Sequence, residues 1–161
     1  MAPERLALLV GVTDYGDPGI TKMPFIADEL RGLATALTAT GYTVSTYADA
    51  ADLSSLSIAV EDFVRHAPPG ATLLIMLSGH GVHRAGKDYL VPATARLRAA
   101  DFTRHCLPID VEQHLAHSRA GDVVVLIDAC REGIHLSEKS LTQAWTSGEI
   151  RRVATGNWSG S

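Results

Sequence analysis

The chain has 161 residues, of which 46% are hydrophobic and 20% are charged, and its formal net charge is −4. This length predicts one domain with a substantial core. The charge argues against nucleic acid or an anionic membrane as a partner, and no apolar run approaches the ~18 residues of a membrane span. The two cysteines, Cys106 and Cys130, are too few for a disulfide framework, and the start lacks the layout of a signal peptide. We therefore expect a cytoplasmic, reducing compartment.

The first half of the chain alternates between predicted strands and helices. The apolar run 6–12 predicts a buried strand, and the turn-forming residues of 13–24 predict a loop after it. Apolar residues recur at helical spacing over 27–37 and again over 56–67, which predicts two amphipathic helices. Between them, the β-branched and aromatic segment 42–47 predicts a second strand.

The second half continues this alternation. The run 73–77 predicts a third strand, and 88–92 predicts a short extended piece at an edge. Asp110 is placed to cap a third helix, and the run 123–127 predicts a fourth strand. Strands that alternate with helices in this way predict a three-layer α/β sandwich with a mainly parallel sheet.

Two of these strands run into polar residues that carry chemistry. His80 lies three residues past the run 73–77, and Cys130 lies three residues past the run 123–127. In an open α/β sheet, functional residues gather beyond the carboxyl ends of the strands. If the two strands are neighbours, an imidazole faces a thiol there.

An imidazole beside a thiol suits nucleophilic catalysis. A free thiol has a pKa near ~8.5, and attack on a carbonyl needs the thiolate. Histidine can accept the thiol proton and later deliver it to the leaving amine, while the N–H groups of Gly81 and Cys130 are candidate donors to the oxyanion. Taken singly, Cys130 could be an inert core cysteine and His80 a structural loop histidine. Their occurrence together favours the catalytic interpretation.

The segments Ser78-Gly79-His80-Gly81 and Asp128-Ala129-Cys130-Arg131 resemble those of the caspase and metacaspase superfamily of cysteine peptidases. The bacterial metacaspase-like group gives the better match. The 50-residue spacing from His80 to Cys130 agrees with the caspase arrangement. Further matching pieces are Leu9-Val10-Gly11-Val12 with Tyr15, Asp88-Tyr89-Leu90-Val91-Pro92 and Leu107-Pro108-Ile109-Asp110. The resemblance, from about Leu6 to Glu132, implies a caspase-like fold in which this chain supplies four strands of a six-stranded family sheet.

The resemblance also implies roles for individual residues. His80 would be the general base and Cys130 the nucleophile, with the Gly81 N–H in the oxyanion hole. Metacaspases carry Asp at the position of Asp128 and cut after Arg or Lys, and a buried carboxylate there is complementary to a guanidinium. Asp28 and Ser78 match two further pocket residues of metacaspases.

Some features of the sequence have ordinary alternatives or depart from the family pattern. Asp128 could instead be a capping or surface carboxylate, and Ser78 a small residue before a glycine turn. Phe25 stands where some metacaspases place a cysteine. Glu132 and Gly133 also differ from the residues that usually follow the catalytic cysteine.

No metal or other cofactor is indicated. Some metacaspases bind calcium through an acidic cluster after the histidine, whereas the corresponding residues 83–88 are basic here. His114 and His117 share a predicted helix, and Cys106 follows His105, but the spacing is not that of a structural zinc site. We interpret these residues as part of a solvated surface.

The C-terminal part of the chain turns polar after Gly133. We predict a large-subunit-like catalytic domain over 1–135 and a linker or tail over 136–161, in which Arg151 and Arg152 would suit cleavage by the enzyme's own pocket. No comparable apolar run follows, so the Cys130 strand would lie at an exposed edge, which invites aggregation. We therefore expect a small-subunit segment or a second chain to complete the sheet.

These observations predict a cysteine endopeptidase that cleaves protein or peptide substrates after Arg or Lys through a Cys130–His80 dyad. One alternative is a catalytically silent interaction module on the same fold, serving as a signalling scaffold. A second alternative, a nucleotide-binding doubly wound domain, is disfavoured because the first strand is not followed by a Gly-x-Gly-x-x-Gly turn.

Overall fold

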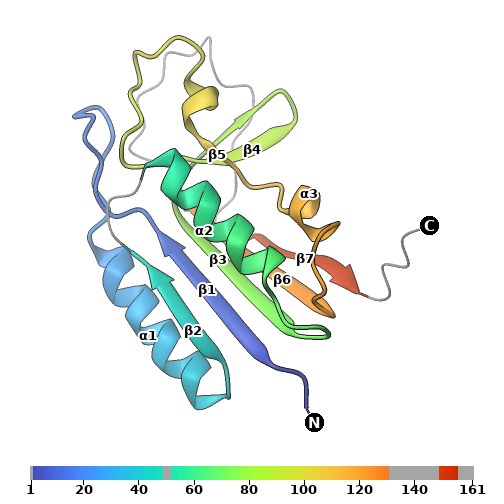
Figure 1. Cartoon of the computed structure of the whole chain (residues 1–161). Coiled ribbons are helices and arrows are strands. Elements are labelled where there is room, and N and C mark those ends of the chain that lie inside the picture. Colours follow the sequence, from blue (N-terminus) through green and yellow to red (C-terminus); the bar gives the residue numbers. More distant parts are fainter. Residues whose placement is uncertain (1, 49–51, 131–148, 156–161) are drawn as a thin grey trace.

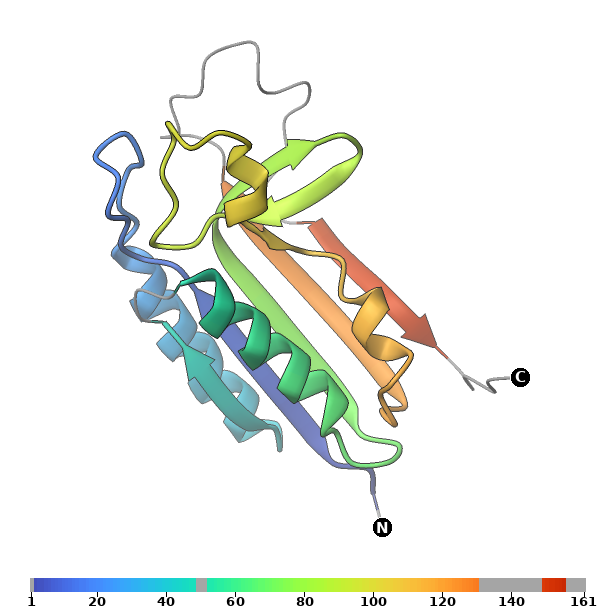
Figure 2. The ribbon, with the colours of Figure 1, turned by 45° about the horizontal axis from the view of Figure 1, so that its top comes forward.

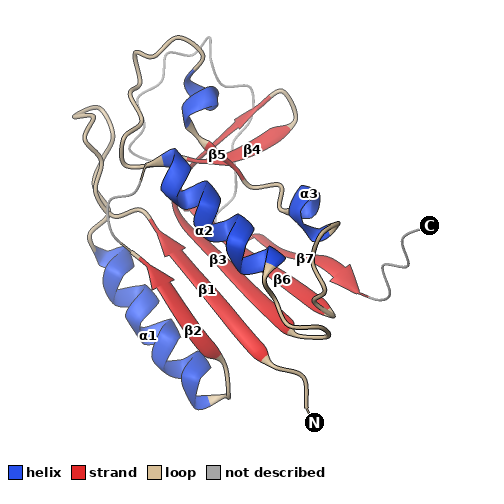
Figure 3. Cartoon of the chain, in the orientation of Figure 1, coloured by secondary structure: helices blue, strands red, loops and turns tan. Residues whose placement is uncertain are grey.

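The computed structural model of the chain describes residues 2–48, 52–130 and 149–155, with the backbone alone for Cys130 and for 149–155. The polypeptide alternates between strands and helices, as Figures 1 and 3 show. The elements in chain order are β1 (Arg5–Gly11), α1 (Phe25–Ala39), β2 (Thr43–Tyr47), α2 (Leu53–Arg65), β3 (Thr72–Arg84), β4 (Lys87–Leu90), the 3₁₀ helix η1 (Phe102–His105), β5 (Leu107–Pro108), α3 (Glu112–Leu115), β6 (Asp122–Cys130) and β7 (Glu149–Thr155).

The main sheet has the strand order β2-β1-β3-β6-β7. The first four strands in this order are parallel, and β7 joins β6 in the antiparallel direction. A short antiparallel branch, β4 followed by β5, extends from the carboxyl-terminal end of β3. The mainly parallel α/β sandwich expected from the sequence is confirmed, and the four predicted strands form its parallel part.

Helices lie on both faces of the sheet, and its inner strand β1 is buried on both sides, whereas the edge strand β2 is mostly exposed. Figure 2 shows α2 and α3 in front of the sheet and α1 behind it. Alternate residues of β3, Leu73, Ile75 and Leu77, belong to the core cluster on the α2 and α3 side. On the other face, Leu9 packs with Ile26 and Leu30 of α1. Side chains alternate along a strand, which explains why these runs are apolar without interruption.

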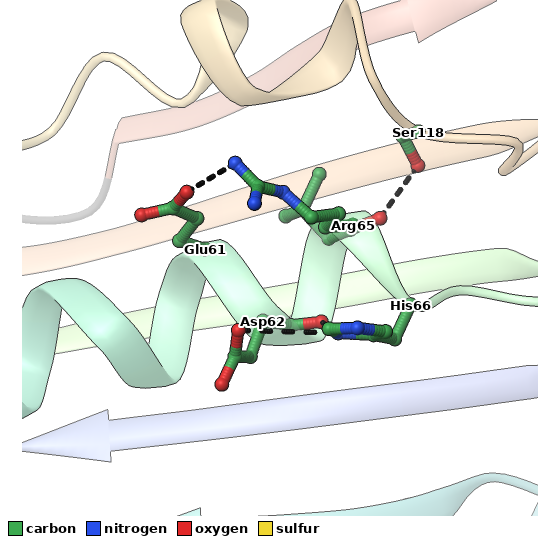
Figure 4. A network of polar contacts seen from close by, with 6 residues as sticks. Glu61, Asp62, Arg65, His66 and Ser118 are labelled. Atoms are coloured by element: carbon green, nitrogen blue, oxygen red, sulfur yellow. Dashed lines mark hydrogen bonds and ion pairs between the residues drawn. The ribbon is translucent and has the colours of Figure 1, made fainter.

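A hydrogen bond joins the end of α2 to the chain that follows α3 (Figure 4). The hydroxyl of Ser118 donates to the carbonyl oxygen of Val64 at 2.7 Å, and so satisfies one of the carbonyls left unpaired at a helix end. On the exposed surface of α2, Arg65 and Glu61 form an ion pair one turn apart. The buried side of the helix is thereby held against the sheet close to α3.

The third helix is shorter than expected from the sequence. It comprises four residues, Glu112–Leu115, and the side chain of Asp110 accepts a hydrogen bond from the Glu112 N–H at 3.1 Å. The N-cap position is Val111, without a side-chain cap, so Asp110 lies one residue before the capping position predicted for it, and the helix ends after one turn. Leu115 supplies its buried contact with the core.

No apolar run like those of the other strands follows Gly133, yet the chain supplies a further strand there, β7. β6 pairs with β7 of the same chain, with Val125 opposite Arg151 and Val124 opposite Arg152, so the edge of β6 is covered. The predicted linker or tail thus contains a strand, while its parts at 136–148 and 156–161 lie outside the described residues. Cleavage after Arg151 or Arg152 would require β7 to leave the sheet.

Candidate active site

His80 and Cys130 are direct neighbours across two parallel strands. The register of β3 and β6 pairs Ser78 with Asp128, and His80 with Cys130. Neighbouring strands lie about 4.8 Å apart, so the two backbones are in contact. The sequence placed both residues beyond the strands, and this was wrong, because β3 continues past His80 and β6 extends to Cys130. The juxtaposition itself, predicted on the condition that the strands are neighbours, is present.

The polar residues of β3 lie on the face of the sheet that α1 covers. Leu77 points into the core under α2 and α3. Because side chains alternate between the two faces along a strand, the side chains of Ser78 and His80 point to the opposite face. Ser78 and His80 are on that other face and are buried, with 2% and 0% of their surface exposed. Asp128, the register partner of Ser78, is half-buried. The strand pairing therefore brings three predicted site residues and Cys130 to one end of the sheet.

A main-chain carbonyl defines the tautomer of His80. The Nε2 atom of His80 lies 2.7 Å from the carbonyl oxygen of Thr21, in the loop between β1 and α1. A carbonyl oxygen can only accept a hydrogen bond, so Nε2 carries a proton. In the neutral ring, Nδ1 is then the nitrogen able to accept a proton from another group. Sequence reasoning missed Thr21, since a backbone carbonyl leaves no signature in the residue type.

Tyr15 is a second neighbour of His80 that sequence reasoning left without a role. Its ring centroid lies 5.0 Å from that of the imidazole, with the planes tilted by 54°. Its hydroxyl accepts a hydrogen bond from the His80 N–H at 3.0 Å. The position matched the family pattern in the sequence, but only the folded loop shows which residue the tyrosine contacts.

Gly81 is a glycine because β3 and β6 approach each other closely at that point. A Cβ atom on Gly81 would lie 2.7 Å from the Cβ of Ala129, a distance that real Cβ atoms do not tolerate. Gly79 and Gly81 both lie within β3 and not in a turn. Gly79 has a φ of +149°, which suits a residue without a side chain.

The two carboxylates expected to bind substrate lie in different environments. Asp128 is half-buried in β6, beside Ser78. Asp28 lies in the first turn of α1, where its side chain is 79% exposed and pairs with Arg31 at 2.5 Å. The structure therefore places Asp128 and Ser78 with the site, while Asp28 stands on the solvent-facing surface of the helix.

The loop that carries Tyr15 and Thr21 is fastened by Asp17. The carboxylate of Asp17 accepts hydrogen bonds from the N–H groups of Gly19 and Leu97, each at 2.8 Å. These bonds, the Gly19 one foremost, hold the pKa of Asp17 below its usual range. The carboxylate thus joins the loop before α1 to the segment after β4.

We expect Asp17→Ala to lower the melting temperature by a few degrees at neutral pH, because two backbone donors lose their acceptor. A depressed folded-state pKa gives stability that is present above the ordinary Asp pKa of about 3.9 and is lost as the pH falls through the folded value. The gap in melting temperature between wild type and variant should therefore shrink toward pH 3 in calorimetry. Glu29→Ala, at an exposed carboxylate of α1, is the control. If the difference in melting temperature between wild type and Asp17→Ala is the same at pH 7 and pH 3, the ionised Asp17 carboxylate does not stabilise the loop.

The histidines of the described residues do not group with Cys106 into a metal site. Within residues 2–48, 52–130 and 149–155, no three His, Cys, Asp or Glu side chains are grouped as metal ligands. Cys106 is buried, and burial raises the pKa of its thiol to about 12. In the same described part of the chain, no helix has the length and apolar composition needed to cross a membrane.

The α/β fold and the pairing of His80 with Cys130 across β3 and β6 are those of a caspase-like protein. The chain matches the family model described as the caspase domain over residues 4–156, and it belongs to that family. The family supports a caspase-like cysteine peptidase at this general level. No curated protein matches the chain.

Two solved structures have a similar fold. Protein GSU0716 from Geobacter sulfurreducens has a TM-score of 0.57 at 19% identity, with 80% of this chain and 51% of that chain covered. The Drosophila initiator caspase Dronc has a TM-score of 0.53 at 12% identity, with 85% and 59% covered. Identities this low show the fold alone. The chain thus spans between half and three-fifths of the length of these two proteins.

Proposed function

We propose that the protein is a cysteine endopeptidase that cleaves after Arg or Lys, with Cys130 as the nucleophile and His80 as the general base. The observation that supports this most is the register pair of His80, within β3, and Cys130, the last residue of β6. The contact of His80 Nε2 with the Thr21 carbonyl adds to it, since it leaves Nδ1 as the proton acceptor.

In the proposed mechanism, the Cys130 thiol gives its proton to Nδ1 of His80, and the thiolate attacks the scissile carbonyl carbon. The resulting tetrahedral intermediate collapses when the imidazolium donates that proton to the leaving amine and the C–N bond breaks. A water molecule then gives a proton to His80, attacks the thioester and releases the acid and the free thiol. The Thr21 carbonyl stabilises the imidazolium through the Nε2 proton.

We assign the Gly81 N–H to the oxyanion hole. His80 directs its N–H to Tyr15 and accepts at its carbonyl from the N–H of Val91, which directly follows β4, so both groups point to the side of β3 that pairs with β1 and β4. Backbone directions alternate along a strand, so the N–H of Gly81 is directed toward the side of β6. That side carries Cys130, and the parallel register of His80 with Cys130 directs this N–H to the Cys130 carbonyl, so its role as a donor to the developing negative charge requires that ladder bond to open.

We assign Asp128 to the binding of the substrate's Arg or Lys side chain, with Ser78 and Asp28 as further pocket residues. A partly buried carboxylate attracts a guanidinium and can bind it through two parallel hydrogen bonds. Asp128 lies two residues before the nucleophile on the same strand, so a bound side chain would reach it from the scissile bond. We propose that the protein is metacaspase-like because of this specificity and because the segments 78–81 and 128–131 resemble those of metacaspases.

An Arg-ending peptidyl chloromethylketone tests this function directly. We expect its alkyl group to add to Cys130 with loss of chloride, as seen by intact mass and peptide mapping, and an Asp-ending analogue to leave the protein unmodified. Cys130→Ala should take no label. Absence of both labelling and peptide hydrolysis would favour the silent scaffold instead.

Chelation should not affect activity, because a thiol and an imidazole suffice for the proposed chemistry and we propose no cofactor. Hydrolysis of an Arg peptide in excess EDTA is expected to stay within about twofold of the rate in calcium, because EDTA removes no group that takes part in the proposed reaction. The residues around His83 and Asp88 pair with each other across the β3–β4 hairpin rather than forming a calcium cage. Complete loss of hydrolysis in EDTA, restored by calcium, would overturn the proposal that the reaction needs no cofactor.

We further propose that a small-subunit-like segment or a second chain extends the sheet beyond β7. In the part of the chain that the structure describes, β7 pairs with β6 alone. The other edge of β7 would offer unpaired backbone groups to such a strand.

A further inference from the structure

The hydrogen-bond ladder between β1 and β3 ends on a side chain instead of the backbone. The Val12 N–H donates to the Ser78 carbonyl at 3.0 Å, and in a parallel ladder the next bond would run from the His80 N–H to the Val12 carbonyl. The Tyr15 hydroxyl stands in this place. It accepts from the His80 N–H at 3.0 Å and donates to the Val12 carbonyl at 3.2 Å. Since a direct bond spans about 2.9 Å, two bonds in series hold the strands further apart there.

The surroundings of Tyr15 keep this hydroxyl in place. Tyr15 is 3% exposed, and burial raises the pKa of its hydroxyl well above the usual range, so it remains a donor to Val12. Gly79 leaves the necessary room, because a Cβ atom on it would lie 3.0 Å from the hydroxyl oxygen. The same tyrosine places its ring against the imidazole of His80.

We propose that Tyr15 is a positioning residue that sets the place of His80 relative to Cys130, an inference that rests on the proposed peptidase function. The hydroxyl bridge separates His80 from β1, and the ring limits the tilt of the imidazole. Together with the Thr21 carbonyl on Nε2, these contacts hold His80 from both its backbone and its side chain. Without the hydroxyl, the His80 N–H could bond directly to Val12, and the residue would move toward β1.

Tyr15→Phe is the first test, because it removes the hydroxyl and keeps the ring. We expect kcat for an Arg peptide to fall by about tenfold to 10²-fold, with KM changed by less than about twofold, since small displacements of a catalytic group cost this much. Tyr47→Phe, at a half-buried tyrosine of β2, is the matched control and should keep the wild-type kcat. Equal kcat in Tyr15→Phe and wild type would overturn the proposal.

A second readout follows the thiol without peptide hydrolysis. In a Cys106→Ala background, the rate of Cys130 alkylation by iodoacetamide against pH gives the apparent thiol pKa. We expect a value below ~8.5 in the parent protein and a shift back toward ~8.5 in Tyr15→Phe, because a displaced imidazole stabilises the thiolate less. A merely structural loss of stability would leave this pKa unchanged in the folded protein, and an unchanged pKa would count against positioning.

The two proposals can fail separately. If the parent protein shows neither hydrolysis nor a lowered thiol pKa, the peptidase function fails. The positioning is then judged on the imidazole ¹⁵N resonances of His80, which do not depend on activity. A change of these resonances in Tyr15→Phe, absent in Tyr47→Phe, supports the proposal, and identical spectra overturn it. Gly79→Ala should act in the same direction as Tyr15→Phe, since its methyl group would displace the hydroxyl.

Discussion

Replacing Cys130 with Ala is expected to reduce hydrolysis of an Arg peptide by about 10³-fold or more, to the level of the background reaction. The variant deletes the sulfur atom that we propose attacks the substrate carbonyl. Cys130 is the residue that pairs with His80 in the register of β3 and β6. Backbone pairing of β6 with β3 and β7 does not involve the thiol, so we expect the fold to persist. Steady-state kinetics and circular dichroism on the same preparation measure both expectations.

The chain offers a matched control, because it has one other cysteine. Cys106 is buried, its thiol pKa is raised to about 12, and its Sγ donates to the Phe102 carbonyl at 3.5 Å. Cys106→Ala should therefore keep its activity. If instead Cys130→Ala retains substantial hydrolysis, the assignment of the nucleophile is wrong.

His80→Ala is expected to cause nearly the same loss as Cys130→Ala, and the double variant should be no worse than either single one. Residues that act as a unit in one proton transfer give such non-additive losses. His117→Ala, at an exposed histidine after α3, is the control for a general effect of losing an imidazole. Additive losses in the double variant would mean that the two residues do not form a dyad.

The sequence was sufficient to predict the parallel core of the fold. The apolar runs 73–77 and 123–127 place alternate residues in the core under α2 and α3, and these runs are visible without a structure. β7 escaped detection because its sequence, with Glu149 and two arginines, lacks such a run. An antiparallel strand at the border of a sheet need not be buried on both faces, so its pattern is weak.

The site was predicted in its residues but not in its geometry. His80 and Cys130 follow apolar runs, so they were expected beyond the strands, yet the strand pairing extends as far as these two residues, which are partners in the ladder. The carbonyl of Thr21 and the hydroxyl bridge of Tyr15 depend on how the loop after β1 folds back. Such contacts are long-range, and no local spacing rule encodes them.

Substitution of Asp128 is expected to have the second-largest effect, on the choice of substrate. We expect Asp128→Asn to lower kcat/KM for an Arg peptide by about 10²-fold, within the 10²–10⁴ range for losing the partner of a bound charge. The low end of this range applies because Asp128 is half-buried, so water would solvate an unpaired guanidinium in part. The amide keeps the size of the carboxylate and removes its charge.

A citrulline peptide separates the loss of charge pairing from a general loss of activity, because citrulline has the shape of arginine without the charge. Wild type should prefer Arg over citrulline strongly, and Asp128→Asn should reduce this ratio by about the same 10²-fold while the kcat/KM for citrulline stays nearly constant. Asp28→Asn is the matched comparison at the exposed carboxylate that already pairs with Arg31. We expect a smaller loss there, because charge attraction at an exposed position is weakened by solvent. An Arg-to-citrulline ratio that Asp128→Asn leaves unchanged would show that this carboxylate does not read the substrate's charge.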